Sequence, residues 1–244
     1  MRLHLAGICS ADGIKDELGD ILYGLESFAY WKPWEGAYIK KWKGFLLDSG
    51  AFTFIMSGKV GADFESYVDK YIEFVKAYQI ERFFEMDTDS VHGYDKVRQI
   101  RHRIENAVGR QTIPVWHITR GMDDFRTMCR DYKYVAIGTM VNKNGKKLRI
   151  KHIEKQLIDM AHEQGCQIHG LGRTSDTDFR MGYDSVDSTS WLSATRWGSV
   201  PQYVNGRIVN VHTPNKRMCR GRIDALHHSI QAWKKMQQYA DKYL

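Results

Sequence analysis

Short apolar runs alternate with amphipathic stretches along most of this chain. The apolar runs predict buried strands, and their ranges are 3–8, 45–48, 82–89, 112–118, 134–140, 167–172, 182–191 and 207–211. Between them, apolar residues recur at helical spacing and predict helices over 64–79, 94–108, 123–130, 148–163 and 224–243. Such alternation is typical of parallel strands linked by crossover helices. Eight repeats favour an α/β fold with one (β/α)8 (TIM) barrel domain spanning residues 1–244.

One stretch does not fit the alternation. The segment 30–42 is irregular and rich in aromatic residues, namely Tyr30, Trp31, Trp34, Tyr38 and Trp42. These rings are suited either to stacking against bases or to covering one end of a barrel.

Composition is consistent with one globular domain. The chain has 244 residues, of which 43% are hydrophobic and 27% charged, and its 4 prolines mark no linker. No apolar run is long enough to cross a membrane, and the start, 1–7, is too short and interrupted for a signal peptide. We therefore expect a cytoplasmic protein, or one in the host cytoplasm if a phage encodes it.

The cysteines indicate neither a disulfide framework nor a metal centre. Cys9, Cys129, Cys166 and Cys219 are far apart and form no CxxC pair. The adjacent pair His227–His228 lacks a matched second pair of ligands, so we interpret it as surface residues. The sequence predicts no metal and no cofactor.

Positive charge is the strongest compositional signal. The formal net charge is +7, and the isoelectric point is near 9.1. Much of this charge falls in two basic stretches, Lys143, Lys146, Lys147, Arg149 and Lys151, then Lys216, Arg217, Arg220 and Arg222. Clustered cations gain affinity for phosphates by releasing counterions, so a nucleic-acid partner is expected.

Three predicted strands end in a carboxylate: Asp48, Asp87 and Asp187. In a parallel barrel the carboxyl ends of the strands share one face, which would bring these groups together. Paired carboxylates suit displacement at a sugar anomeric carbon, with one as nucleophile and one as proton carrier. The alternative for each is that it caps the following helix. Trp116 and Trp191 are candidates either to stack against a base at this face or to pack in the core.

Several short motifs, in order, resemble the tRNA-guanine transglycosylase superfamily. The stretch 47–52 resembles its Asp-Ser-Gly-Gly-Phe signature, and 182–188 resembles the strand that carries its nucleophile. Segments 85–87, 136–138 and 169–172 are similar to three further family strands, and Thr195-Arg196 followed by 206–210 is similar to its Pro-Thr-Arg segment and next strand. The resemblance covers about residues 46–210.

The resemblance implies a role for each matching residue. Asp187 would be the nucleophile and Asp48 the general acid/base, while Asp87 would hold the edge of a guanine-type base. The other residues implied at the base are Ser49, His117, Gly138, Thr139 and His169; those implied at nucleic acid are Lys146, Lys147, Arg149, Arg196, Lys216 and Arg217.

Departures from the family pattern matter equally. His117 stands where the family has a base-reading Gln, and Thr139-Met140 stands where it has Gly-Leu. The cysteine-rich zinc module expected after the eighth strand is absent, and only Cys219 falls there. This shortened pattern resembles the DNA-directed phage and bacterial relatives, which insert a 7-deazaguanine into DNA.

The sequence thus predicts a transglycosylase that replaces guanine in DNA with a 7-deazaguanine base, without metal or cofactor. Three alternatives remain open: the same exchange on tRNA, a barrel N-glycosidase that uses water with these carboxylates, and a non-catalytic nucleic-acid-binding protein. The particular base, the preferred DNA context and the oligomeric state are not predicted.

Overall fold

The computed structural model describes residues 1–57, 62–138, 151–193, 199–212 and 223–244. These residues form two compact units. The first comprises Met1–Leu25, Lys32–Phe45 and Gly172–Leu244, and the second comprises Glu26–Trp31 and Leu46–Leu171. The single domain expected over residues 1–244 stays a prediction.

The first unit is built on the strand β1 (Arg2–Ala6), which pairs in parallel with β2 (Tyr23–Ser27) on one side and β7 (Ser185–Ser188) on the other. Leu3 and Leu5 of β1 are fully buried. Long 3-10 segments, mainly η1 (Ile8–Asp20), link β1 to β2. The short elements η3 (Pro33–Ala37), α7 (Asp176–Phe179) and η5 (Ser190–Leu192) also belong to this unit.

The final helix, α9 (Ile223–Tyr243), packs against β1. Gln237 of this helix is fully buried, and its Nε2 donates to the carbonyls of Leu3, at 2.8 Å, and Tyr23, at 2.6 Å. Its Oε1 accepts a hydrogen bond from the Leu22 N–H at 3.0 Å. One amide side chain therefore joins α9 to the backbone around two neighbouring strands.

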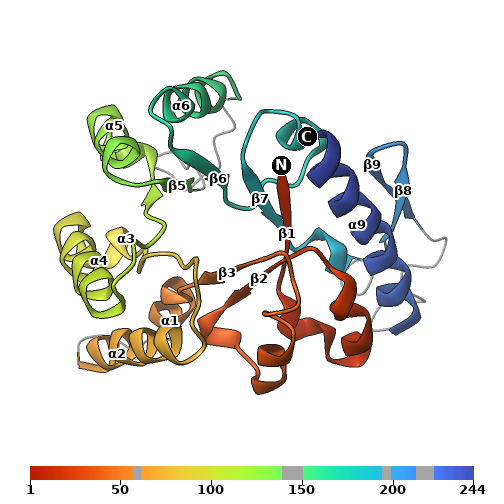
Figure 1. Cartoon of the computed structure of the whole chain (residues 1–244), viewed down its shortest axis with the longest axis horizontal. Coiled ribbons are helices and arrows are strands. Elements are labelled where there is room, and N and C mark those ends of the chain that lie inside the picture. Colours follow the sequence, from red (N-terminus) through yellow and green to blue (C-terminus); the bar gives the residue numbers. More distant parts are fainter. Residues whose placement is uncertain (58–61, 139–150, 194–198, 213–222) are drawn as a thin grey trace. The chain divides into compact units, whose positions relative to one another are not determined.

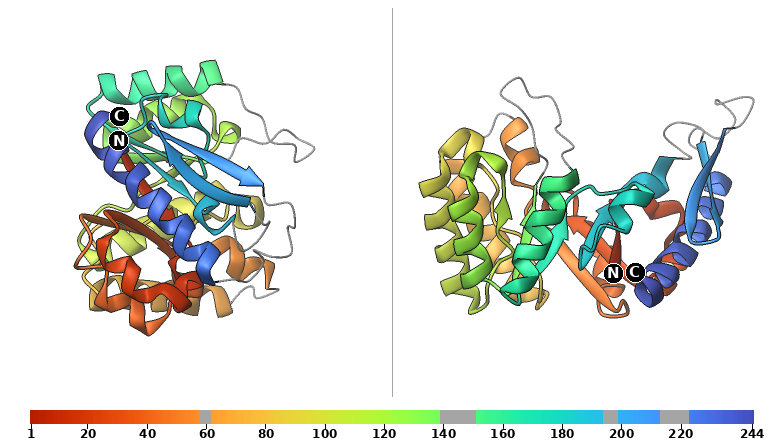
Figure 2. Two further views of the ribbon diagram at one scale, coloured as in Figure 1. Left: turned by 90° about the vertical axis from the view of Figure 1, so that its right-hand side faces the viewer. Right: turned by 90° about the horizontal axis from the view of Figure 1, so that it is seen from above.

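The prediction of an eighth parallel strand over residues 207–211 is wrong. Residues 207–211 belong to β9 (Arg207–His212), which pairs antiparallel with β8 (Ser199–Val204) in a separate two-stranded sheet. The turn between them is Asn205-Gly206, with φ values of 47° and 76°. An Asn-Gly pair with both φ values positive is the tight turn that folds a strand back on itself. This hairpin lies along α9 in both views of Figure 2.

The second unit contains three neighbouring parallel strands in the order β4 (Val115–Trp116), β5 (Tyr134–Ile137) and β6 (Gln167–Gly170). The end of β3 (Gly44–Asp48) continues this pattern through isolated parallel bridges, Leu47 to Phe83 and Phe84 to Ile113. The range 82–89, expected to be a strand, thus pairs only through single bridges.

The helices of the second unit follow the strands as expected, and Figure 1 shows the alternation. The longer ones are α2 (Ala62–Ala77), α4 (Tyr94–Val108), α5 (Met122–Asp131) and α6 (Lys151–Glu163). Shorter elements are η2 (Phe28–Tyr30), α1 (Ala51–Met56), α3 (Asp89–His92) and η4 (Ile118–Arg120). The range of α4 agrees with the prediction because Gly109, at φ 73°, ends the helix in the left-handed conformation that glycine favours.

The predicted fold class is confirmed: among the described residues, the paired strands β1, β2 and β7 of the first unit and β4, β5 and β6 of the second run parallel and alternate with helices, as in TIM-type α/β proteins. The strand β2 was missed. It lies just before the aromatic segment 30–42, where Trp31 packs edge-on against Phe74 and Tyr78. Trp42 is buried against Gly24, where a Cβ atom would come within 2.5 Å of its ring. These contacts favour a packing role for both tryptophans.

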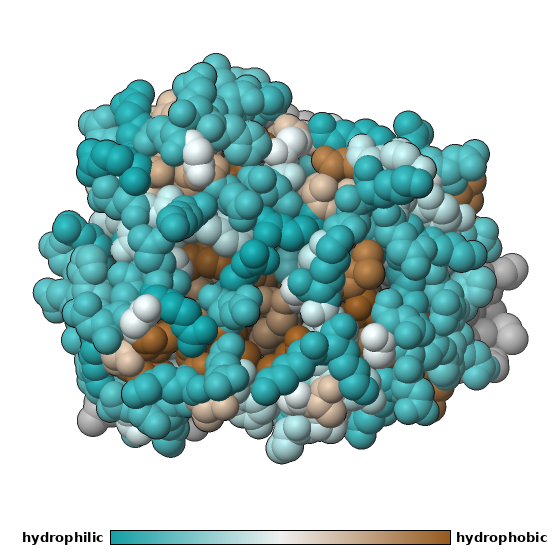
Figure 3. All heavy atoms as spheres, in the orientation of Figure 1, coloured by the Kyte–Doolittle hydropathy of each residue, from teal (hydrophilic) through white to brown (hydrophobic). Residues whose placement is uncertain are grey.

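Among the described residues, no helix combines the length and apolar character needed to cross a membrane. Most of the surface that Figure 3 shows is hydrophilic. The cytoplasmic location stays a prediction.

Candidate functional site

The clearest polar site of the second unit is a pair formed by Asp87 and His117. The Nε2 atom of His117 lies 2.9 Å from Oδ1 and 2.8 Å from Oδ2 of Asp87. His117 directly follows β4, and Asp87 follows the bridged residue Phe84, so both lie at the carboxyl ends of neighbouring parallel strands. Both side chains stay partly open, with 26% of His117 and 32% of Asp87 exposed. A ligand can therefore reach the pair.

Gly138 directly follows β5 and leaves the space that the His117 ring occupies. A Cβ atom at residue 138 would lie 2.4 Å from Cε1 and 2.7 Å from Nδ1 of His117. Such contacts are far inside van der Waals distance, so any larger residue would push the ring away from Asp87. Three residues that the resemblance placed around one base, Asp87, His117 and Gly138, are thus together in the structure.

A buried network of charged side chains lies next to this pair. Glu85 is fully buried; its Oε2 accepts from Arg101 Nε at 2.7 Å, and its Oε1 accepts from the Val115 N–H at 2.7 Å. Arg120 reaches Glu85 Oε1 at 3.2 Å and pairs with Asp89 through two hydrogen bonds of 2.6 and 2.5 Å. A nitrogen of Arg120 also lies 3.7 Å from Asp87 Oδ1.

Arg120 has little freedom to move. Its side chain is only 2% exposed, and its guanidinium lies 4.2 Å from the centre of the Tyr94 ring. Cation–π contact and several charge-assisted hydrogen bonds hold it in one orientation. Sequence reasoning missed Arg120 and Glu85, although Arg120 follows His117 by three residues and Glu85 precedes Asp87 by two.

Burial and pairing shift the pKa values in this network. Burial raises the pKa of Glu85, and the charges of Arg101 and Arg120 oppose that effect. Burial acts to lower the pKa of His117, but its hydrogen bond to Asp87 and the charge of Asp87 more than compensate, so this pKa is raised. With His117 protonated, three cations face the carboxylates of Glu85, Asp87 and Asp89. The pair can therefore donate a hydrogen bond to a ligand from His117 and accept one from the ligand at the Asp87 carboxylate.

Thr88 is a further polar group at this site. Its side chain is 1% exposed, and its hydroxyl has no hydrogen-bond partner among the described residues. A buried hydroxyl without a partner carries a desolvation cost that a ligand can relieve.

Asp48 and Ser49 lie at the carboxyl end of β3. Asp48 Oδ2 accepts a hydrogen bond from the Gly50 N–H at 3.1 Å, and the buried Ser49 Oγ accepts from the Ala51 N–H at 3.4 Å. The Tyr67 hydroxyl donates to the Ser49 carbonyl at 2.7 Å. Burial and the charge of Asp48 raise the pKa of Tyr67, which keeps this hydroxyl a donor.

Asp187 belongs to the first unit, on β7. Its Oδ1 accepts a hydrogen bond of 2.7 Å from the N–H of Gly172, which has φ 61°. In the parallel pairing of β1 with β7, Asp187 lies opposite His4. The backbone N–H of Gly172 orients the Asp187 carboxylate, and an oriented carboxylate can act as a nucleophile.

His169 does not open onto the surface. It is fully buried on β6, with its ring 5.3 Å from that of Phe84 and 6.3 Å from that of Tyr134. Its predicted contact with the base stays a prediction.

The two tryptophans considered for base stacking pack in the core instead. Trp116 is 1% exposed and donates from Nε1 to the Gly121 carbonyl at 2.9 Å. Trp191 is 0% exposed and donates to the Ala6 carbonyl at 2.8 Å. Both indole rings are thus buried and hydrogen-bonded inside the protein and offer no face to a base. The stacking alternative is wrong.

Several predicted residues lie outside the described residues. They are Thr139 of the base site and the nucleic-acid residues Lys146, Lys147, Arg149, Arg196, Lys216 and Arg217. Within the part of the chain that the structure describes, no group of three or more His, Cys, Asp or Glu side chains is arranged to hold a metal ion.

Comparison with known proteins gives a fold but no family. No protein-family profile matches the chain, and no curated protein matches it. Among solved structures, it is similar to a thiamine phosphate pyrophosphorylase from Pyrococcus furiosus, at 6% identity and a TM-score of 0.53, over 100% of this chain and 96% of that one.

Two further structures are more distant. The aldolase QR15 has a TM-score of 0.49 at 11% identity, over 78% of this chain and 89% of that chain. The carboxyl transferase domain of Rhizobium etli pyruvate carboxylase has a TM-score of 0.47 at 15% identity, over 98% of this chain and 48% of that chain. At identities this low, a shared fold carries no substrate with it. The chain therefore has a TIM-type α/β fold, and its activity must be argued from its own residues.

Proposed function

We propose that this protein is a base-exchange transglycosylase that replaces guanine in DNA with a 7-deazaguanine. The observation that supports it best is the Asp87–His117 pair beside Gly138. A carboxylate next to a protonated imidazole matches the edge of a guanine-type base, where N–H donors adjoin a carbonyl acceptor. The ordered motifs that resemble the transglycosylase superfamily support the same reading.

The proposed reaction has two displacements at one carbon. The Asp187 carboxylate attacks the anomeric carbon of a guanosine, forming a C–O bond while the bond to guanine breaks and Asp48 supplies a proton to the leaving base. The incoming 7-deazaguanine then loses a proton to Asp48 and attacks the same carbon. The bond to Asp187 breaks, which restores both carboxyl groups.

The nucleophile is tested by Asp187→Asn. A neutral amide cannot form the covalent intermediate, so exchange should fall at least about a thousandfold while nucleic-acid binding persists. Wild-type protein stopped during turnover should carry a nucleic-acid adduct on Asp187 by mass spectrometry. Asp123→Asn is the control, because this side chain is 99% exposed. Wild-type rates in Asp187→Asn would remove this residue from the reaction.

The roles of the other two carboxylates separate in steady-state kinetics. Asp87→Ala removes acceptors for the base edge and should mainly raise KM for the incoming base. Asp48→Ala removes the proton carrier and should mainly lower kcat. If both variants lose only affinity for nucleic acid, this division of roles is wrong.

One experiment identifies the nucleic-acid substrate. Duplex DNA, single-stranded DNA and tRNA are each incubated with the protein and candidate 7-deazaguanines, and the nucleosides are analysed by mass spectrometry. Insertion into DNA is expected. Insertion into tRNA alone would replace DNA by tRNA, and release of guanine without insertion would indicate an N-glycosidase. Binding without any turnover would indicate a non-catalytic protein.

A further inference from the structure

The second unit has a pocket at the amino ends of its parallel strands, opposite the ends where Asp87 and His117 lie. A pocket of about 510 Å³ opens where 112–113 lead into β4, where β5 begins at Tyr134 and where β6 begins at Gln167. This volume is in the range of small-molecule pockets. Gly138 is four positions after Tyr134 along the extended chain of β5, which corresponds to roughly 13 Å. The pocket is thus distinct from the Asp87–His117 pair.

Two cations line this pocket without a carboxylate bound to them. Arg82 and Lys133 form no ion pair with any described residue, whereas the buried arginines Arg101 and Arg120 both do. Glu81 is the one carboxylate among the described lining residues, so the lining carries a net positive charge. Unneutralised cations in a concave site concentrate anions there.

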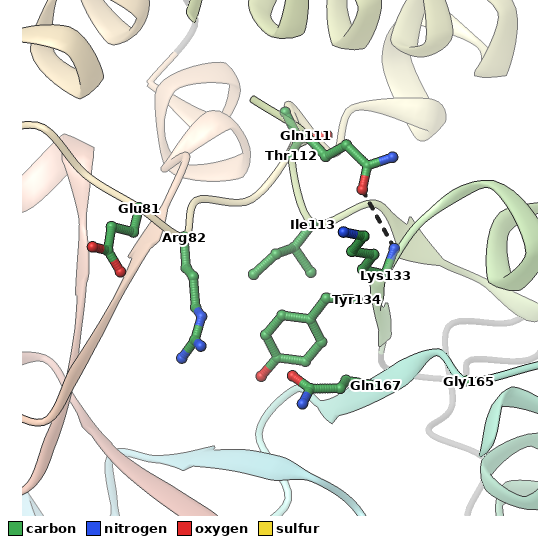
Figure 4. A pocket seen from close by; sticks show the side chains of 9 residues that line it. All are labelled: Glu81, Arg82, Gln111, Thr112, Ile113, Lys133, Tyr134, Gly165 and Gln167. Carbon is green, nitrogen blue, oxygen red and sulfur yellow. Dashed lines mark hydrogen bonds between the residues drawn. The ribbon is translucent and has the colours of Figure 1, made fainter. Parts of the chain in front are cut away.

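Part of the remaining wall is apolar, and part of it is held by hydrogen bonds. Ile113 is 3% exposed and Tyr134 is 9% exposed, and Figure 4 shows them between Arg82 on one side and Lys133 on the other. Gln111 is held by hydrogen bonds from its Nε2 to the Asp131 carbonyl, at 2.8 Å, and from the Lys133 N–H to its Oε1, at 3.4 Å. A wall already ordered in this way costs little to organise around a ligand.

We propose that this pocket binds a small phosphorylated metabolite. Its phosphate would contact Arg82, whose planar guanidinium matches a dianion, and Lys133 on the other side would add to the positive potential of the pocket. Its apolar or aromatic body would lie against Tyr134 and Ile113. This site is independent of the proposed base exchange, since it uses other residues at the other end of the strands.

Calorimetric titration of the full chain tests the proposal, with phenyl phosphate, benzoate and benzyl alcohol as probes. Phenyl phosphate should bind at least tenfold more tightly than benzoate and benzyl alcohol. Losing one charge-assisted contact costs about 1.5–3 kcal/mol, so Arg82→Gln should weaken the binding of phenyl phosphate at least about tenfold, and Lys133→Gln should weaken it by a smaller factor. Arg82→Lys should recover part of the loss.

The control variants are Arg98→Gln and Lys76→Gln, which neutralise exposed cations of the same unit. They should bind phenyl phosphate like the wild type, and thermal unfolding should show that every variant is folded. Equal affinity for benzoate would overturn the phosphate assignment. Equal binding by the Arg82→Gln/Lys133→Gln double variant, or no binding of phenyl phosphate to the wild type at millimolar concentration, would overturn the site.

Discussion

At the scale of single residues, the candidate site depends on one histidine held between a carboxylate and a glycine. His117 pairs with Asp87 through Nε2, and the Cε1–Nδ1 edge of its ring lies against Gly138. Each contact constrains a different property: the carboxylate controls protonation, and the glycine controls position. Two variants separate them.

The ion pair predicts a pH-dependent contribution to stability. Because the pKa of His117 is raised in the folded protein, its contribution is fully present below the unfolded value of about 6.5 and is lost as pH rises through the folded value. In urea denaturation, His117→Gln should therefore be less stable than the wild type by about 2 kcal/mol at pH 6. The difference should shrink by pH 9. A difference that does not change with pH would show that His117 is neutral in the fold.

The close approach of Gly138 to the His117 ring predicts that a side chain at position 138 lowers both stability and activity. Gly138→Ala places a methyl group in steric conflict with the His117 ring. The substitution should therefore cost about 1–3 kcal/mol of stability and displace the imidazole. Base exchange should fall with it. Gly19→Ala is the matched control, since nothing lies within 4 Å of its added Cβ, and it should leave both properties nearly unchanged. Chemical denaturation and exchange assays on the two variants provide the comparison.

At the scale of elements, buried charges join α4 and η4 to the strand ends. Arg101 of α4 and Arg120 of η4 share the carboxylate of Glu85, which also accepts from the backbone of β4. Glu85 lies between the two isolated bridges and Asp87 along the chain. The network therefore fixes the backbone that presents Asp87, where strand pairing alone is sparse.

Removing one cation from this network should be costly. Arg101→Met leaves the Glu85 carboxylate buried with less compensation, so it should cost about 3–5 kcal/mol. Arg98→Met on the same helix breaks an exposed 4.0 Å pair with Asp95 and a 6.0 Å contact with the Tyr94 ring, and should cost about 1 kcal/mol or less. Urea unfolding measures both. Similar costs for the two variants would mean that the buried network contributes no more than a surface pair.

At the scale of the whole molecule, the net charge of +7 predicts that nucleic-acid binding weakens as salt rises. Neutralising Lys146, Lys147 and Arg149 to Gln should weaken binding to all DNA sequences alike and make the log–log salt slope shallower by about 3. The control neutralises three exposed lysines elsewhere, Lys40, Lys70 and Lys76. Fluorescence anisotropy at several salt concentrations gives the slopes. Equal slopes for both triple variants would remove the first basic stretch from the interface.

Part of the candidate site could be predicted from the sequence because strand ends and glycines leave local signals. The apolar run 115–116 followed by a polar residue indicated His117, and the resemblance of 136–138 to a strand of the transglycosylase superfamily implied Gly138. Arg120 and Glu85 were missed because nothing local shows which charged residue becomes buried; that depends on packing against Tyr94 and on partners 16 and 35 residues away. Trp116 and Trp191 were ambiguous for the same reason.

The sequence by itself determined the alternation of strands and helices, the ends of helices such as α4, and the excess of positive charge. These properties depend on residues close together in the chain: apolar spacing, capping glycines and counted charges. The tertiary structure decided which charges pair around Asp87 and that Arg82 and Lys133 line one pocket. Those outcomes depend on contacts between segments distant in sequence, whose burial and partners no local pattern contains.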